Sequence, residues 1–166
     1  GPVYRHSYKA RYRIYDRQST TITELSEGGK QQAATFSPDG RKVAFVRDNN
    51  LYYVSLDDGT EHQVTRDGQF NFIINGIPDW VYEEEFSFSR AYQWSPASDQ
   101  IVFLRFDESQ VKQYNMNMFE NQLYPSVYTF KYPKAGEKNS IVSAHVYNLN
   151  TGAIQRMDTG TEEDQY

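Results

Sequence analysis

The fold is decided by the stretch Phe36-Ser37-Pro38-Asp39-Gly40-Arg41-Lys42-Val43-Ala44-Phe45-Val46-Arg47. Its Ser-Pro-Asp-Gly segment is typical of a tight turn, and the apolar residues on both sides predict two strands that the turn joins. The same pattern returns 58 positions later, where Trp94-Ser95-Pro96 is followed by Ile101-Val102-Phe103-Leu104-Arg105. Repetition of a strand pair at such an interval indicates a repeat architecture.

Further hairpins lie between and around these two copies. Residues 51–65 and 144–157 each predict a strand, a turn that ends in glycine, and a second strand, and residues 12–25 look like a copy truncated at its front. Calcium binding is the alternative for Asp57-Asp58-Gly59, although a hairpin turn explains these residues without it. Four short strands per unit, at a period of about 40–45 residues, are typical of β-propeller blades. We therefore predict an all-β chain that forms a partial β-propeller of about three four-stranded antiparallel blades, the first and last incomplete.

Two insertions break the period. The interval between the two Ser-Pro turns exceeds a usual blade by about 15 residues, and the excess falls on residues 75–90. In the next blade the excess is a segment rich in Tyr, Met and Asn, residues 107–139. Insertions are where a propeller usually carries its function. We expect a short helical Glu-Glu insertion at 75–90 and an extended arm at 107–139.

Composition narrows the possible partners. The 166-residue chain has 17 basic and 22 acidic side chains, a balance that argues against nucleic acid as a partner. It has no cysteine, which excludes disulfides and thiolate metal sites, and we predict no metal site and no cofactor. No apolar run approaches the roughly 18–20 residues that cross a bilayer. The chain also has no Asn-x-Ser/Thr glycosylation site. A bacterial protein of the periplasm or the cell surface, or a secreted one, fits the lack of this site and of cysteine most easily, although a cytosolic protein would also fit it. The acidic residues at 162–164 are interpreted as a solvated loop.

The carboxylates of the first insertion point to a ligand. Asp79 is predicted to cap a helix of about two turns that Trp80 and Phe86 pin to the layer beneath. Adjacent helical residues point about 100° apart, so Glu84 and Glu85 can both reach one small cation. A primary ammonium has three donors and no acceptor, so the predicted ligand is the free N-terminus of a peptide. The alternative is that the Glu-Glu-Glu run is only a solvated patch of charge.

Several motifs, in a fixed order, connect these features to a known family. They are Arg5-His6-Ser7-Tyr8 with Ile14-Tyr15-Asp16, Asn75-Gly76 with Asp79-Trp80-Val81-Tyr82-Glu83-Glu84-Glu85, Trp94-Ser95-Pro96, and Tyr132-Pro133-Lys134-Ala135-Gly136. The chain resembles, over nearly its whole length, the N-terminal β-propeller of the dipeptidyl peptidase IV family, serine peptidases of the prolyl oligopeptidase superfamily, in a bacterial form. The resemblance implies that residues 1–166 are a fragment of that propeller and that the catalytic α/β-hydrolase domain lies outside it.

The resemblance also implies roles for single residues. Glu84 and Glu85 would bind the α-ammonium of a peptide substrate, and Arg5 would donate to the carbonyl of its first residue. Supporting roles fall to Glu83, and to Asp79, Trp80 and Tyr82. The arm would join two copies into a homodimer through residues that include Tyr114, Met116, Met118 and Phe119.

Bond cleavage is not expected from this chain alone. No Gly-x-Ser-x-Gly nucleophile motif occurs in it, so a Ser-Asp-His triad would lie beyond Tyr166, and no catalytic residue is assigned here. His62 and His145 are interpreted as ordinary strand residues, and His6 as a positioning or packing residue. The expected function is substrate recognition in a serine exopeptidase that removes Xaa-Pro or Xaa-Ala dipeptides. The alternatives are a non-catalytic propeller that binds protein or glycan, and a family member that has lost its nucleophile.

Overall fold

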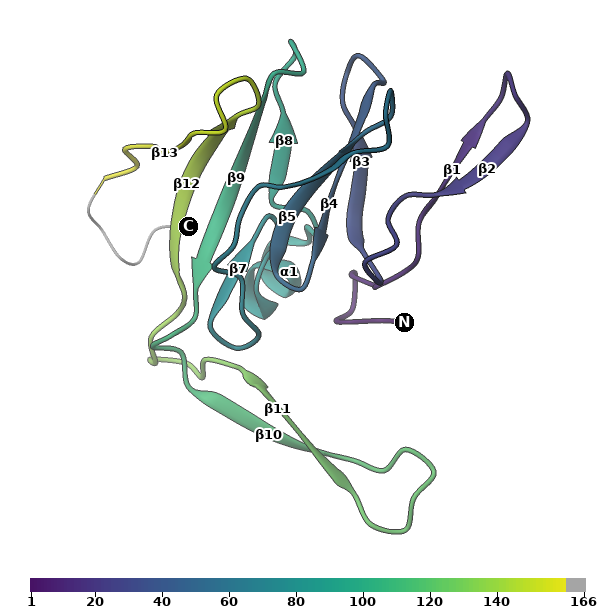
Figure 1. The fold of residues 1–166 in the computed structure, drawn as a ribbon. Helices are drawn as coiled ribbons and strands as arrows, with labels where there is room; N and C mark the ends of the chain where they lie inside the picture. Colours follow the sequence, from purple (N-terminus) through teal and green to yellow (C-terminus); the bar gives the residue numbers. More distant parts are fainter. Residues whose placement is uncertain (161–166) are drawn as a thin grey trace.

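Short antiparallel strands dominate the computed structural model, which describes residues 1–160 (Figure 1). One sheet has the strand order β3-β4-β5-β6 and consists of β3 (Gln32–Phe36), β4 (Lys42–Arg47), β5 (Asn50–Ser55) and β6 (Glu61–Gln63). Its strands pair in the order of the sequence, as the strands of a propeller blade do. The Ser-Pro-Asp-Gly stretch forms the turn between β3 and β4, as predicted.

A second sheet repeats this arrangement with its first strand split in two. β12 (Ile141–Asn148) pairs on one side with β13 (Ile154–Arg156) and on the other with β9 (Gln100–Asp107). Both β7 (Ile73–Asn75) and β8 (Tyr92–Trp94) pair with β9, with Asn75 opposite Arg105 and Tyr92 opposite Phe103. The two short strands together occupy one position, so this sheet also has four strand positions.

A third unit is represented only by its outer hairpin, β1 (Arg13–Asp16) and β2 (Thr21–Glu24). The prediction of an all-β partial propeller of about three blades is therefore confirmed, and the first blade is truncated as expected. The expectation that the last blade is also incomplete is wrong, because residues 154–156 pair with β12 as its fourth strand.

The hydrophobic core lies between neighbouring sheets. The larger cluster joins β4 and β5 of one sheet to β7, β8 and β9 of the next, and its buried members include Val46, Leu51, Tyr53, Ile74, Trp94, Ile101, Phe103 and Phe106. A smaller cluster joins the β1-β2 hairpin region to the same β4 and β5, through Leu25, Val43, Phe45 and Val54. The β3–β6 sheet is thus buried on both faces, as the apolar run of β4 requires, and the second sheet is buried on the face that packs against it.

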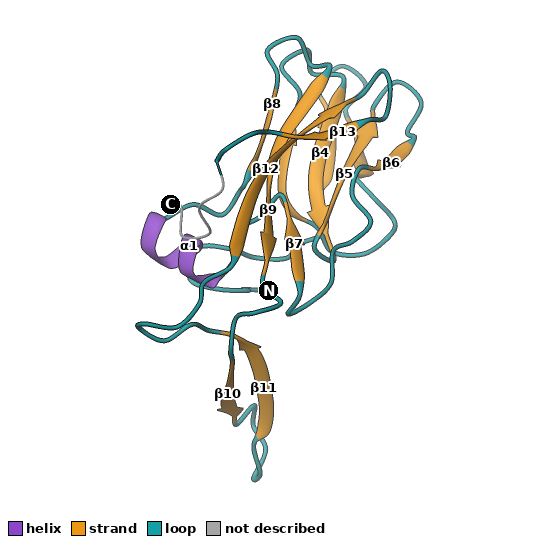
Figure 2. Cartoon of the chain, turned by 90° about the vertical axis from the view of Figure 1, so that its left-hand side faces the viewer, coloured by secondary structure: helices purple, strands orange, loops and turns teal. Residues whose placement is uncertain are grey.

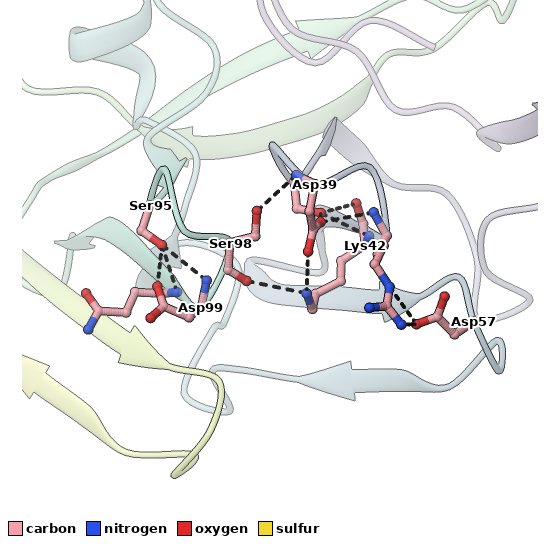
Figure 3. A network of polar contacts seen from close by, with 9 residues as sticks. Asp39, Lys42, Asp57, Ser95, Ser98 and Asp99 are labelled. Carbon is pink, nitrogen blue, oxygen red and sulfur yellow. Dashed lines mark hydrogen bonds and ion pairs between the residues drawn. The ribbon is translucent and has the colours of Figure 1, made fainter.

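The two repeated Ser-Pro turns lie side by side and are bonded to each other (Figure 3). The Asp39 N–H donates to Ser98 Oγ at 3.0 Å, and the Lys42 ammonium donates to the Ser98 carbonyl at 3.4 Å. Ser98 has a φ of +60°, a left-handed conformation that Gly40 adopts at the matching place in the first turn. The Asp39 carboxylate accepts from the Ser37 hydroxyl at 2.5 Å, and this bond leads the causes that lower its pKa to about 2. These turn residues therefore hold neighbouring blades together.

Two excursions leave the second sheet (Figures 1 and 2). Helix α1 (Trp80–Phe86) lies between β7 and β8, and a hairpin of β10 (Gln113–Met118) and β11 (Ser126–Lys131) lies between β9 and β12. The hairpin projects away from the sheets, and we call residues 108–140 the arm. Within residues 1–160 no helix has the length and apolar character needed to cross a membrane. The predicted solvated loop at 162–164 lies outside the described residues.

Candidate functional site

Helix α1 emerges from the break in the first strand of the second sheet. The Ala91 N–H donates to the Gly76 carbonyl at 2.9 Å, and Leu104 of β9 bonds to both residues, accepting from the Gly76 N–H at 3.0 Å and donating to the Ala91 carbonyl at 2.8 Å. Gly76 has a φ of +77°, and a Cβ there would lie 3.1 Å from Val46 Cγ2, which favours glycine. The insertion is therefore fixed at both ends to β9.

Asp79 caps the helix and connects it to the end of the arm. Its carboxylate accepts from the Tyr82 N–H at 2.9 Å and from the Ser140 hydroxyl at 2.5 Å. Only 4% of Asp79 is exposed, and this burial raises the pKa of its carboxyl, while the two hydrogen bonds oppose the rise. The helix ends at Ser87, which has a φ of +58°. The cap thus forms where the sequence predicts it.

Tyr82 holds the helix against the sheet. It is buried, and its ring lies edge-on to the ring of Phe106 with centroids 5.1 Å apart. Trp80 packs against Tyr132 at the base of the arm, with centroids 4.3 Å apart. The prediction that Phe86 pins the helix is wrong, because Phe86 is half exposed and Tyr82 takes the buried position. In a helix of only two turns, the pattern of aromatic residues does not tell whether Tyr82 or Phe86 is the buried one.

The N-terminal segment meets the helix at two consecutive glutamates. Arg5 Nη2 lies 2.7 Å from Glu84 Oε1, with 72% of the arginine side chain and 19% of the glutamate side chain exposed. The next residue of the N-terminal segment contacts the preceding residue of the helix: the His6 N–H donates to Glu83 Oε1 at 2.8 Å. Glu83 is 2% exposed, so this hydrogen bond is shielded from water. The structure therefore brings Arg5 and Glu84 together and uses Glu83 to fix the segment that carries Arg5.

Glu85 is placed differently from its neighbours. It is exposed and, within residues 1–160, makes no ion pair or hydrogen bond through its side chain. It follows Glu84 directly in α1, so the exposed carboxylate of Glu85 is the next one along the helix from the carboxylate that pairs with Arg5. The site thus contains one neutralised carboxylate and one open carboxylate.

A cavity of about 450 Å³ lies beneath this site, between the N-terminal segment, α1 and the arm. Tyr4 and Glu83 line it, each one position before a residue of the Arg5–Glu84 pair. Glu108, at the root of the arm, lines it from below and is only 4% exposed. Burial raises the pKa of the Glu108 carboxyl to about 7, and Asp79 adds to the rise by charge repulsion.

The arm exposes apolar side chains along its length. Tyr114, Met116 and Phe119 are 41%, 43% and 61% exposed, and Leu123 and Tyr124 are more exposed still. Met118 instead lines the cavity. The predicted arm residues therefore do not share one environment.

Metal binding has no support in the described part of the chain, where no three His, Asp or Glu side chains are grouped to hold an ion. Asp57, the residue considered for calcium, forms an ion pair with Arg41 (Figure 3). Sequence reasoning missed Glu108 and Tyr4. Glu108 could have been suspected because it is a carboxylate that directly follows the mainly apolar strand β9. Nothing in the sequence around Tyr4 points to its place in the cavity wall.

Three comparisons with known proteins agree on the same group. A family model described as the dipeptidyl peptidase IV (DPP IV) N-terminal region matches residues 1–166. The crystal structure of Porphyromonas gingivalis dipeptidyl peptidase 4 is similar with a TM-score of 0.96 and 49% sequence identity, over 100% of this chain and 24% of that one. Dipeptidyl aminopeptidase B of Saccharomyces cerevisiae is 38% identical over 154 residues, which are 90% of this chain and 18% of the yeast protein. This chain spans about a fifth to a quarter of the length of these relatives.

Proposed function

Since the chain belongs to the family of dipeptidyl peptidase IV N-terminal regions, we propose that it is the substrate-recognition part of a serine exopeptidase that removes N-terminal Xaa-Pro or Xaa-Ala dipeptides. The observation that carries the proposal is the approach of Arg5 to Glu84 at 2.7 Å beside the open carboxylate of Glu85. The names of the similar proteins, all dipeptidyl peptidases or aminopeptidases, support the reaction class. The preference for proline or alanine is an implication of the family.

Glu84 and Glu85 would bind the α-ammonium of the substrate. Removing an ammonium from water without a partner costs several kcal/mol, so a site that accepts it must supply fixed negative charge. Arg5 neutralises Glu84 in the absence of peptide, and Glu85 keeps its charge available. An incoming ammonium would share Glu84 with Arg5 and take Glu85 as its second partner. A peptide with a blocked N-terminus would lack the charge that these carboxylates require.

Arg5 would then fix the length of the fragment that is released. Its guanidinium has five N–H donors in a planar fork, and the contact with Glu84 leaves donors free on a side chain that is 72% exposed. One of them would bind the carbonyl of the first substrate residue. With the ammonium and this carbonyl both held, the second peptide bond would be placed at a constant distance, where the nucleophile of a catalytic domain would act.

The test measures kcat/KM of the full-length protein on a chromogenic Gly-Pro substrate. We expect Glu84→Gln and Glu85→Gln each to lower kcat/KM by about 10- to 150-fold, because a hydrogen bond to a charged group contributes about 1.5–3 kcal/mol. Glu24→Gln is the matched control, since Glu24 is a surface carboxylate of β2 that forms ion pairs with Arg11 and Arg13, far from α1 in the sequence. Near-native kinetics in both helix variants would reject the recognition role and leave the propeller as a protein- or glycan-binding module.

We further propose that the arm joins two copies of the protein into a homodimer. Its exposed apolar residues, which include Tyr114, Met116, Phe119, Leu123 and Tyr124, form a surface that a monomer rarely leaves uncovered. A second copy would cover this surface in a symmetric contact, the commonest form of self-association.

A further inference from the structure

The cavity below helix α1 has walls from three parts of the chain. The N-terminal segment contributes Tyr4 and Lys9, the loop before β7 contributes Phe70, and the arm contributes Tyr128. Its volume, about 450 Å³, falls in the range of small-molecule sites. Arg5, Glu84 and Glu85 are not among its lining residues, so it is separate from the site proposed for the peptide terminus.

Glu108 is a buried carboxylate without a hydrogen-bond donor. More than nine-tenths of the residue is buried, and within residues 1–160 its carboxylate accepts no hydrogen bond and forms no ion pair. The nearby Lys131 ammonium donates to the Val111 carbonyl at 2.6 Å instead. Among the described residues the only fully enclosed side-chain polar atom without a partner is Asn75 Oδ1, so the Glu108 oxygens are not sealed off and open onto the cavity that the residue lines. The missing donor therefore has room to enter from the cavity.

Charges and rings around the cavity favour a cation as that donor. Three carboxylates line it, those of Glu83, Glu108 and Glu120, against one ammonium, that of Lys9. The charged groups that act on Glu108 are the carboxylates of Asp79 and Asp107 and the ammonium of Lys131, and Tyr4 is the neutral titratable group beside it. The rings of Phe70 and Tyr128, with centroids 6.4 Å apart, supply an aromatic wall of the kind that attracts cations.

We propose that this cavity binds a primary alkylammonium ion, whose –NH3+ group donates to the Glu108 carboxylate while its aliphatic stem packs against Phe70 and Tyr128. The ion has the three donors that the buried carboxylate lacks, and its stem matches the apolar part of the wall. A free amine and the lysine side chain of a peptide both have this chemistry. The site does not depend on the role proposed for Glu84 and Glu85.

The test is calorimetric titration of the full-length protein at about pH 8, where Glu108 is ionised. The protein carries Glu84→Gln, so that binding of amine at the proposed peptide-terminus site is weakened. The probes are n-butylammonium, for a free amine, and Nα-acetyl-lysine N-methylamide, for a lysine side chain that has no free N-terminus. We expect Glu108→Gln to weaken binding of n-butylammonium at least about tenfold, the scale of one charge-assisted hydrogen bond.

Controls separate this outcome from its alternatives. Glu120→Gln alters an exposed carboxylate at the cavity rim and should weaken binding much less than Glu108→Gln does. The neutral isostere n-butanol should not bind. Binding of both probes with the same dependence on Glu108 would extend the site to lysine side chains, and binding of n-butylammonium alone would assign it to free amines. Absence of binding in the Glu84→Gln protein, or equal affinity after Glu108→Gln, would overturn the proposal whether or not Glu84 serves the peptidase.

Discussion

Three buried carboxylates around helix α1 differ in the donors that satisfy them. Asp79 accepts from the Tyr82 N–H and the Ser140 hydroxyl, and Glu83 accepts from the His6 N–H. Glu108 accepts no hydrogen bond from residues 1–160, and its pKa of about 7 reflects burial first and the charge of Asp79 second. No hydrogen bond opposes the rise in the pKa of Glu108, whereas the hydrogen bonds from Ser140 and Tyr82 oppose the rise in the pKa of Asp79.

Glu108 should make the protein less stable as the pH rises. The ordinary pKa of its carboxyl is 4.5 and the folded value is about 7, so between these values the folded state binds the proton that the unfolded state has lost. The free energy of unfolding therefore falls through this window, by up to about 3 kcal/mol. Glu108→Gln should remove most of the fall, and urea unfolding of both proteins at about pH 5 and pH 8 measures it.

The control for this experiment is again Glu120→Gln, which changes an exposed carboxylate and should leave the pH dependence of unfolding as it is in the unaltered protein. Parallel stability curves for the unaltered protein and Glu108→Gln would mean that Glu108 keeps its proton no better when folded than when unfolded.

At the scale of elements, helix α1 and the base of the arm form one joint. Trp80 and Tyr132 pack with centroids 4.3 Å apart and planes inclined by 40°, and the Ser140 hydroxyl donates to the capping carboxylate of Asp79. These contacts connect the two insertions directly, although β8 and β9 separate them in the sequence. The position of the helix should therefore depend on the arm, and the position of the arm should depend on the helix.

A double-mutant cycle tests this joint. Trp80→Leu and Tyr132→Leu should each destabilise the protein, and the double variant should lose less than the sum of the two by about 0.5–1.5 kcal/mol, the usual coupling of an aromatic pair. Urea unfolding measures the change in the free energy of unfolding for each single variant and for the double variant. Trp80→Leu combined with Tyr15→Leu, an exposed ring of β1, should be additive within about 0.5 kcal/mol. Additivity of the Trp80 and Tyr132 changes would show that the two insertions are independent.

The elements themselves were predictable where their causes are local. Ser-Pro-Asp-Gly sets the turn between β3 and β4 through its own backbone preferences, and Asp79 caps α1 through a bond to Tyr82, three residues away. Glu108 could not be interpreted from its neighbours, because its burial arises only when the arm and the N-terminal segment close over it. Likewise, the choice of Tyr82 over Phe86 as the buried ring depends on Phe106 in another strand.

At the scale of the whole molecule, the arm predicts self-association. Met116→Glu and Phe119→Glu place charge on exposed apolar positions of the hairpin and should leave the cavity wall, which contains Met118, intact. We expect each change to weaken the proposed homodimer at least about tenfold, since charge buried without a partner at an interface is strongly unfavourable. Light scattering over a concentration series measures the shift to monomer.

Tyr15→Glu alters a similarly exposed aromatic residue on β1 and should leave the dimer unchanged. A dimer of full strength in both arm variants would mean that the arm has another role.

The hydrogen bond from His6 to Glu83 spans 77 positions of the chain. A ribosome delivers the Arg5 segment first, and the β1-β2 hairpin and the whole β3–β6 sheet emerge before the glutamates that complete its surroundings. A polypeptide whose synthesis stops before α1 would contain the strands of one blade and Arg5, but it would lack Glu84, the partner of Arg5 in the ion pair. The proposed capture of peptides would therefore begin only once translation has passed α1, and shorter products would not compete for substrate.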